Sequence, residues 1–406
     1  MAEAWRAEAW RVRGLFLALL LYGLSSAPAP PGIRVVEAAI GALLMLAVGV
    51  RRPLLVATGH ALRAPGVAAW ELPAILALSW LLWVPLLRGA WVGWSAGDML
   101  RDVVPLLYLF LPVLLVPVLR PVAGPATRLL AGALMLAGLI FALRWWRQAG
   151  WEFDAVGLRV MADGASYFLN APSVLFAAIA LPLTGMGLVL KGGVPRVVAG
   201  VACFGAGVLC LAALAGTVHR MALGLAATAF VAVALWSGRR APWTVGLLAL
   251  GALAVAAGFS DALLGALGLV AEKTRLAGAN TRWEEAAMVF DHVSGSPWSF
   301  LFGDGWGALL SNPAVGGWRV SYTHTLATYA LAKTGALGLL ALGAYLGGLM
   351  PRALTVLREE PPLGWAVLPP LVMALGLHTS FKYLDTGLIL TLMVLAAERR
   401  NALSRA

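Results

Sequence analysis

The chain has 406 residues, of which 61% are hydrophobic and 12% are charged, and its formal net charge is +11. Soluble globular proteins average about 25% charged residues, so this composition excludes an ordinary soluble domain. The apolar residues form continuous blocks of about 18–25 residues, the length of a membrane-spanning helix, and they lack the alternation of a membrane β-barrel. The sequence therefore predicts an all-α, polytopic integral membrane protein that forms a single domain over residues 1–406.

In chain order, the apolar blocks predict about 12 transmembrane helices. A long connection of about residues 260–323 separates the ninth block from the tenth, and we expect it to contain short amphipathic helices. The other connections are shorter than this one. The approximate limits of the expected spans are 14–27, 34–50, 71–88, 103–119, 126–143, 172–190, 195–215, 218–236, 242–259, 324–350, 363–379 and 383–398.

Basic residues are divided unequally between the two alternating sets of connections. One set, with the N-terminal segment, holds about 17 Arg and Lys residues, and the other holds about 12, of which roughly a third lie in the long connection that the positive-inside rule discounts. The rule predicts that both termini are cytoplasmic and that residues 260–323 face outward. The excess of basic residues on one side is typical of the cytoplasmic face of a membrane protein. The expected partner is therefore membrane lipid and not nucleic acid.

The stretch "NTRWEEAAMVFDHVSG" (280–295) predicts an amphipathic helix in the long connection. Thr281 and Glu284 have the spacing of a capping box, so the helix is expected to start at Arg282. Free N–H groups at a helix start favour anions, and a guanidinium there suits a phosphate, although a solvated surface arginine is the alternative. An apolar stripe with helical spacing follows, formed by Trp283, Ala286, Ala287 and Phe290.

Two residues at the predicted outer ends of spans could carry chemistry. Arg220, in "LAGTVHRMALG" (214–224), lies where a guanidinium must face a partner or a watery cavity, or else extend to the headgroups. His324 begins the tenth span, which Ser321 or Thr323 could cap, and a neutral imidazole is a natural base near pH 7. An interfacial histidine without a chemical role is the alternative. The sequence leaves open whether three other outer histidines belong with these residues: His219, His292 and His378.

The sequence lacks the residue patterns that are typical of metal-binding and nucleotide-binding sites. The sequence contains no Asp-x-Asp pair and no His-x-x-x-His pair, and no glycine-rich nucleotide loop follows a predicted strand. The adjacent Glu284 and Glu285 are expected on different faces of their helix. We therefore expect neither a metal site nor a cofactor. Two arginines and a histidine at membrane level suit a lipid-linked diphosphate, because the arginines can bind phosphates and the histidine can deprotonate an attacking hydroxyl.

Four segments within residues 160–345 resemble the O-antigen ligase and polymerase superfamily of bacterial envelope glycosyltransferases, which have a GT-C-like fold. The chain has Met221 and Ala222 where the family usually has glycine and small residues, and Thr325 where it usually has asparagine. The segments are "YFLNAPSVLFAAIALPL" (167–183), "GTVHRMALGLAATAFVAVAL" (216–235), "RWEEAAMVFDHVSGSPWSFLFGDGWG" (282–307) and "YTHTLATYALAKTGALGLL" (322–340).

The resemblance implies a role for each candidate residue. His324 corresponds to the family's histidine and Arg220 and Arg282 to its arginines. Members transfer glycan from undecaprenyl diphosphate on the periplasmic side of the bacterial inner membrane. A ligase delivers the glycan to lipid A–core, and a polymerase delivers it to another lipid-linked repeat unit. The length and the single long loop favour the ligase, with a metal-independent, inverting transfer.

A lipid-linked glycan transporter or flippase is the alternative from another functional class. Lys333 favours it, because it lies nine residues into the tenth span and an intramembrane lysine is functional by default. The sequence identifies no partner for Lys333, and helical spacing places it on the face opposite His324. The chain shows no internal repeat of the kind common in transporters.

Overall fold

The structure of the protein, a computed structural model, describes residues 2–27, 34–153, 155–156, 165–238 and 281–403, with a few isolated positions between 246 and 272. Over these residues the chain is almost entirely helical, with a single two-stranded antiparallel sheet. The predicted all-α class is confirmed. The predicted ninth span, 242–259, and the first part of the long connection lie almost wholly outside the described residues.

The first part of the chain forms helices joined by short turns. They are α1 (Ala2–Ser25), α2 (Val35–Val48), α3 (Arg51–Ala57), η1 (His60–Arg63), α4 (Glu71–Val92), α5 (Ala96–Leu109), α6 (Leu111–Leu119), η2 (Arg120–Val122) and α7 (Ala123–Gln148).

The second part adds more helices and the small sheet. The elements are η3 (Ala165–Asn170), α8 (Pro172–Leu190), α9 (Val194–Gly216), α10 (Arg220–Gly238), α13 (Thr281–Ser294), α14 (Pro297–Phe302), β1 (Leu310–Asn312), η4 (Pro313–Val315), β2 (Trp318–Val320), α15 (Leu326–Glu359), α16 (Pro361–Val372), the π-helical turn η5 (Met373–Leu377), η6 (Thr379–Lys382) and α17 (Leu384–Leu403).

Six described helices are long and apolar enough to cross a membrane, or seven if the pair α2–α3, bent by 86°, counts as one span. One of the six is the continuous stretch Ala96–Gln148, which combines α5, α6 and α7. The segment predicted as a span over 363–379 falls on the shorter apolar helix Pro361–Leu377. The chain is therefore rich in membrane-length helices, and the number of about 12 spans stays a prediction.

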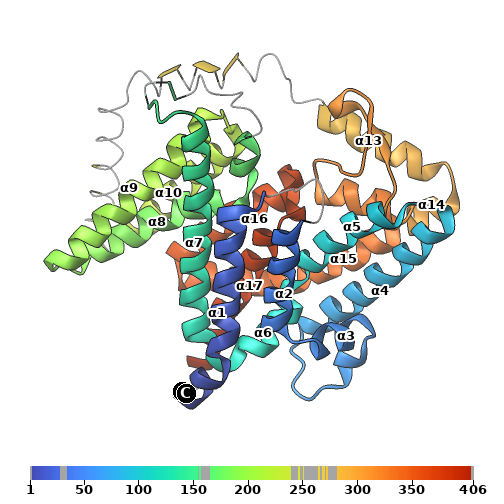
Figure 1. The fold of residues 1–406 in the computed structure, drawn as a ribbon, viewed down its shortest axis with the longest axis horizontal. Helices are drawn as coiled ribbons and strands as arrows, with labels where there is room; N and C mark the ends of the chain where they lie inside the picture. The colour runs from blue at the N-terminus through green and yellow to red at the C-terminus, as the bar shows by residue number, and fades with distance from the viewer. Residues whose placement is uncertain are drawn as a thin grey trace.

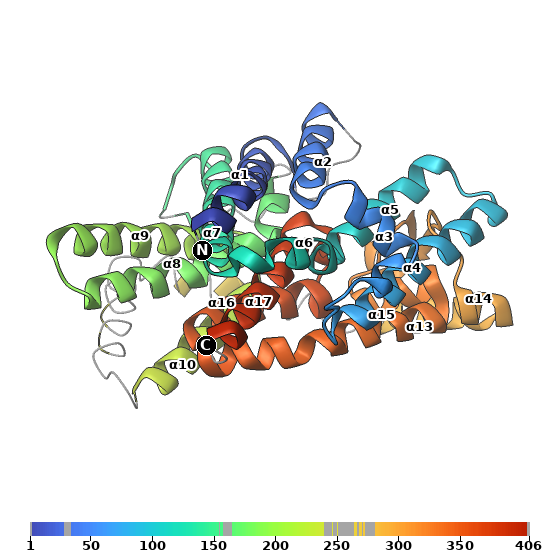
Figure 2. The same ribbon diagram turned by 90° about the horizontal axis from the view of Figure 1, so that it is seen from below.

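The helices gather in three groups. α8, α9 and α10 lie together on one side, α1, α7, α16 and α17 form the middle, and α3–α5 lie with α13–α15 on the other side (Figures 1 and 2). α8 and α17 are the most deeply buried helices, with nearly every side chain from Pro172 to Leu183 and from Leu384 to Ala397 removed from solvent. A helix that is apolar all round is stable only in such a buried position or in lipid.

α15 is broken near its start, at Gly335. Gly335 has φ 67° and ψ −171° inside the helix, a conformation that residues with a side chain rarely adopt. The break leaves two carbonyl groups without helical partners, and backbone N–H groups of the preceding turn bond to them: Asp304 to Ala332 and Gly305 to Lys333, both at 3.0 Å. Unpaired backbone groups at membrane depth cost several kcal/mol, so this turn stabilises the broken helix.

The same turn fills a second gap, in α4. Pro85 has no N–H, so the carbonyl of Leu81 loses its helical hydrogen bond. The indole Nε1 of Trp306 donates to that carbonyl at 2.8 Å, and the backbone N–H of Trp306 donates to the carbonyl of Pro85 at 2.9 Å. The "GDGWG" stretch of the long connection therefore joins α4 to the broken part of α15, and it fixes the position of the loop elements that precede α15.

Ion pairs join several of the connections that the sequence places on one side. Glu71 accepts hydrogen bonds from Arg52 at 3.1 Å and from Arg120 at 2.6 Å, and Arg120 also pairs with Glu398 of α17. The last turn of α17 pairs with Glu360, which lies between α15 and α16. The connections predicted to share the basic side therefore meet at one end of the helices.

Candidate active site

The three residues predicted for the site come from three different elements. Arg220 is the first residue of α10, Arg282 lies in the first turn of α13, and His324 lies in the turn before α15. They are separated by up to about a hundred positions in sequence, yet Arg282 lies within electrostatic reach of both Arg220 and Glu285, and Glu285 binds His324. We refer to Arg220, Arg282, Glu285 and His324 as the His324 cluster.

Glu285 holds His324 by both its backbone and its side chain. The backbone N–H of His324 donates to both carboxylate oxygens of Glu285, at 3.0 and 3.1 Å, and the ring Nδ1 lies 3.0 Å from Oε2. The side chain of Glu285 is 1% exposed and that of His324 is 25% exposed. The carboxylate is therefore shielded from water, while the imidazole keeps an open edge.

The small sheet supplies a further donor to Glu285. Asn312, the last residue of β1, donates from Nδ2 to Oε1 of Glu285 at 2.6 Å. Burial alone would raise the pKa of Glu285, but the hydrogen bonds from the side chain and backbone of His324 and from Asn312 lower that pKa below its usual range. Glu285 is therefore ionised near neutral pH.

Arg282 lies within electrostatic reach of both Glu285 and Arg220. Burial lowers the pKa of the Arg282 guanidinium, the Glu285 carboxylate opposes that shift, and the positive charge of Arg220 adds to it. Two guanidinium groups within electrostatic reach of each other repel, and an anion that binds both would reduce the repulsion. Guanidinium groups bind phosphate through paired N–H donors.

A strained turn positions Arg220. Thr217 ends α9, and Val218 has a left-handed φ of 53°. A β-branched residue in this region costs of order 1–3 kcal/mol, and such residues cluster at functional sites. The turn lies beside η5, because α10 packs against η5, and the ring of His219 is 6.0 Å from that of His378, the residue after η5.

The structure distinguishes among the three other histidines that the sequence predicts on the outer side. The charges of His219, His324 and Arg282 all act on His378, so His378 and its neighbour His219 adjoin the His324 cluster. The Nδ1 atom of His378 is buried and has no hydrogen-bond partner among the described residues. His292 points elsewhere, because its Nε2 pairs with Asp304.

One prediction about local structure is wrong. The residue that caps α15 is Thr325, whose side chain accepts from the N–H of Thr328 at 3.1 Å, and not Ser321 or Thr323. Threonine is a good N-cap residue, because its side-chain oxygen can accept from a free N–H of the first helical turn. His324 consequently lies just outside the helix.

The apolar stripe of α13 lies on the exposed side of the helix. The helix spans Thr281–Ser294, which confirms the predicted start within one residue, but Trp283 and Phe290 of the apolar stripe are 77% and 55% exposed. The face that packs against β1 and α15 contains Val289, together with Glu285. Glu284 is exposed and Glu285 buried, so the expected difference between the two glutamates is confirmed.

Lys333 has a partner that the sequence did not reveal. Its Nζ donates to Oδ2 of Asp102 in α5 at 2.6 Å, and also to the carbonyl of Ala308. The other carboxylate oxygen of Asp102 accepts from Tyr329 at 2.7 Å and lies 3.4 Å from Nζ of Lys382. Lys333 and Asp102 are 1% and 0% exposed, so this is a buried ion pair within the helices.

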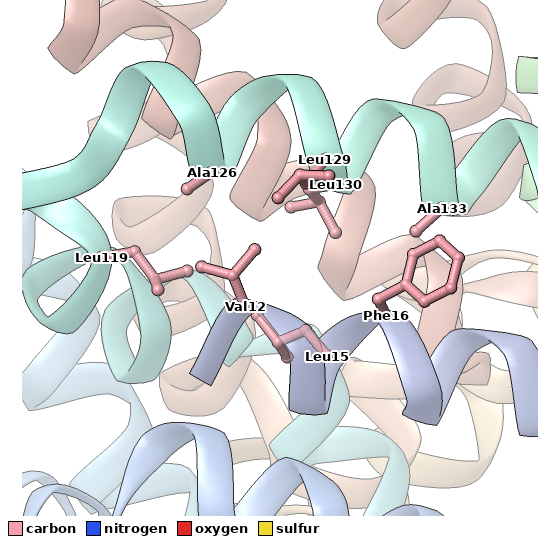
Figure 3. Close-up of a pocket in the computed structure, with 8 residues that line it drawn as sticks. All are labelled: Val12, Leu15, Phe16, Leu119, Ala126, Leu129, Leu130 and Ala133. Carbon is pink, nitrogen blue, oxygen red and sulfur yellow. The ribbon is translucent and has the colours of Figure 1, made fainter. Parts of the chain in front are cut away.

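Two further features of the described residues add no candidate catalytic group. A pocket between α1, α6 and α7 is lined by apolar side chains alone, including Val12, Leu119 and Leu130 (Figure 3), so it contains no group that could transfer a proton. Among the described residues, no three or more His, Cys, Asp or Glu side chains are grouped to hold a metal ion. The His324 cluster therefore combines a histidine that could transfer a proton with two arginines that could bind an anion.

No model of a known protein family matches this chain, and no curated protein is detectably similar to it in sequence. The resemblance to the O-antigen ligase and polymerase superfamily therefore depends on the four quoted segments. These segments adjoin one another in the structure. Tyr167, from the first, contributes with burial to raising the pKa of Tyr322 in the fourth. Arg220, from the second, interacts with Arg282 in the third, and Glu285 in the third binds His324 in the fourth.

Proposed function

We propose that the protein is a membrane glycosyltransferase that transfers glycan from undecaprenyl diphosphate to lipid A–core, as an O-antigen ligase does. The observation that carries this proposal is the grouping of two arginines with a histidine that a buried carboxylate holds. Arg220 and Arg282 supply positive charge for a diphosphate, and His324 is an imidazole with one ring edge open. The proposal joins this chemistry to the sequence resemblance.

The proposed reaction is a single displacement. The acceptor hydroxyl oxygen attacks the anomeric carbon of the donor sugar, and a new glycosidic C–O bond forms as the C–O bond to the diphosphate breaks. The diphosphate leaves with the bonding electron pair, and Arg220 and Arg282 stabilise its growing negative charge. His324 takes the proton of the hydroxyl, a contribution of typically about 10²–10⁴-fold. Attack from the opposite side inverts the anomeric centre.

The proposed location is the bacterial inner membrane, with both termini in the cytoplasm and the His324 cluster facing the periplasm. The meeting of basic connections at one end of the helices supports this orientation, because Arg and Lys are enriched on the cytoplasmic side. A donor diphosphate carried on a lipid lies at the membrane surface. A base in the turn just before a long apolar helix is at a suitable depth for it.

The same chemistry suits an O-antigen polymerase, in which the acceptor is a second lipid-linked repeat unit. Only the acceptor distinguishes the two enzymes, so the deciding experiment supplies both. Purified protein in lipid vesicles receives labelled undecaprenyl diphosphate–glycan together with lipid A–core. Labelled lipid A–core supports the ligase, and elongated lipid-linked glycan supports the polymerase.

A lipid-linked glycan carrier is the second candidate, and the buried Lys333–Asp102 pair beside the break at Gly335 favours it. Broken helices and intramembrane charges are common in transporters. The vesicle experiment separates this candidate, because movement of label across the membrane without a new covalent product supports a carrier.

The matched variants are His324→Ala and His60→Ala. His324→Ala should lose most turnover, about 10²–10⁴-fold, while binding of the lipid-linked donor stays close to that of the wild type. His60 lies in η1 as an exposed side chain bonded to Thr58, so His60→Ala should keep full turnover. Near wild-type transfer by His324→Ala would exclude it as the base. Loss of transfer with EDTA and its return with Mg²⁺ would exclude the metal-independent mechanism.

A further inference from the structure

The hydrogen-bond donors around Glu285 determine which ring nitrogen of His324 carries the proton. Its carboxylate faces three N–H-bearing groups: the backbone N–H of His324, the ring Nδ1 of His324 and the amide Nδ2 of Asn312. An ionised carboxylate can only accept hydrogen bonds. Nδ1 of His324 must therefore carry a proton to bond with Oε2 of Glu285.

The orientation of the Asn312 amide is fixed independently. Its Oδ1 accepts from the backbone N–H of Ala314 at 2.9 Å, and its Nδ2 lies 3.3 Å from the carbonyl of Tyr322 as well as 2.6 Å from Glu285. Turning the amide over would break the bond to Ala314 and would place Oδ1 against the carbonyl of Tyr322. Nδ2 therefore always faces Glu285, and Oε1 of residue 285 must always be an acceptor.

We propose that Glu285 is a positioning residue that holds His324 in the tautomer with the proton on Nδ1, so that Nε2 keeps its lone pair for the proton of the acceptor hydroxyl. No described residue hydrogen-bonds Nε2. The catalytic consequence of this inference rests on the proposed glycosyl transfer, whereas the tautomer itself does not. When the hydroxyl proton moves to Nε2, the ring becomes an imidazolium whose charge the buried carboxylate stabilises.

The substitution Glu285→Gln gives a specific result under this proposal. The oxygen of the new amide must face Nδ2 of Asn312, so its NH₂ group must face Nδ1 of His324. Nδ1 then accepts a hydrogen bond, and the ring proton moves to Nε2. The base is lost although the fold and the hydrogen-bond count are nearly unchanged. In serine proteases the equivalent change from carboxylate to amide lowers kcat about 10⁴-fold, and we expect a loss of about 10²–10⁴-fold here.

A second substitution should reverse the effect. In Glu285→Gln/Asn312→Asp, the new carboxylate at position 312 accepts from Ala314 and from the NH₂ group of Gln at 285. One of its oxygens then lies against the carbonyl of Tyr322, so the reversal is partial. The amide oxygen of residue 285 is then free to accept from the backbone N–H and Nδ1–H of His324. We expect the double variant to regain at least about tenfold of the turnover lost by Glu285→Gln. Asn312→Asp alone should be impaired, because it places two carboxylates against each other.

The tautomer can be measured without any activity. The full-length protein, purified in detergent with ¹⁵N-labelled histidine, gives different ¹⁵N shifts for protonated and unprotonated ring nitrogens, and His324→Ala identifies the signal. The wild type should show Nδ1–H, Glu285→Gln should show Nε2–H, and the double variant should show Nδ1–H again. Glu284→Gln, on the exposed face of α13, should change neither the signal nor the turnover.

The outcomes separate this inference from the proposed function. An Nε2–H signal in the wild type, or an unchanged signal in Glu285→Gln, overturns the inference. The predicted signals in a protein that transfers no glycan support the inference and overturn the proposed function. If Glu285→Gln does not fold, the wild-type signal alone decides, because only the proposed arrangement places the proton on Nδ1.

Discussion

Asp102 should be a main determinant of stability, because the described residues place its carboxylate within hydrogen-bond reach of the buried Lys333 and of the partly buried Lys382. Oδ2 accepts from Lys333 at 2.6 Å and from the N–H of Gly307 at 2.9 Å, and Oδ1 lies 3.4 Å from Lys382. Asp102→Asn leaves both ammonium groups without their negative partner. Removing one partner of a buried ion pair costs about 3–5 kcal/mol, and we expect a loss in that range.

Lys333→Met should lower the free energy of unfolding less than Asp102→Asn does. Asp102 keeps the hydroxyl of Tyr329 at 2.7 Å, the N–H of Gly307 and the ammonium of Lys382, so its charge stays partly compensated. The loss is then close to that of one hydrogen bond to a charged group, about 1.5–3 kcal/mol. Turnover per folded molecule should be retained, because Lys333 contacts Asp102 and not the His324 cluster.

Asp98→Asn is the matched control on the same helix. Asp98 lies 3.6 Å from Arg101, and the two side chains are 27% and 56% exposed. An exposed pair of this kind contributes about 0–1 kcal/mol. The free energy of unfolding of each purified variant is measured by titration with sodium dodecyl sulfate, followed by tryptophan fluorescence. The reasoning is refuted if Asp102→Asn is no less stable than Asp98→Asn. A stable Lys333→Met without turnover would place Lys333 in the active site.

Arg220→Lys and Arg282→Lys should each lower turnover about 10–100-fold although the charge is kept, because lysine lacks the planar guanidinium fork. A double-mutant cycle should give non-additive losses of turnover. Strictly additive losses would mean that the two arginines bind different groups. Gly335→Ala should cost at least about 1–3 kcal/mol in the same unfolding titration, because Gly335 has a positive φ and an added Cβ would overlap the backbone of Leu301 and Gly303. Gly343→Ala, in the same helix with open space around an added Cβ, should be neutral or stabilising. The pKa of Glu285 is lowered in the folded protein, so its stabilisation is complete above its unfolded pKa of about 4.5 and is lost as the pH falls through the lower folded value. The hydrogen-exchange protection factors of residues 281–294, which are corrected for the intrinsic pH dependence of exchange, should therefore fall at acid pH in the wild type, and pH-independent protection factors would contradict the assignment.

The local sequence pattern was sufficient to predict the class of protein and the positions of most helices along the chain. Apolar blocks of membrane length need helical backbone hydrogen bonds wherever they pass through lipid, so their length alone predicts α-helix. The start of α13 near Arg282 followed from the residues of its first turn. The choice of Arg220, Arg282 and His324 came from residue types that are costly at membrane level and from the resemblance, and the structure brings these three together.

The partners of these residues depended on tertiary structure. Asp102 and Lys333 are 231 positions apart, and nothing in either local sequence indicates the other. Glu285 is one of two adjacent glutamates in an amphipathic helix, where a charged residue is normally expected on the exposed face. It is buried because the backbone N–H of His324 and the amide of Asn312 satisfy its carboxylate, and those donors reach it only after the chain has folded.

The sequence by itself determined that the chain forms membrane-length helices, where an amphipathic helix begins in the long connection, and which cationic side chains need a partner. Tertiary structure decided which face of α13 is buried, where α15 breaks and which carboxylate orients His324. The physical reason is the range of the interactions. Helix formation depends on hydrogen bonds and side-chain spacing over about four residues, whereas the burial of a charge is stable only when donors from distant segments compensate it.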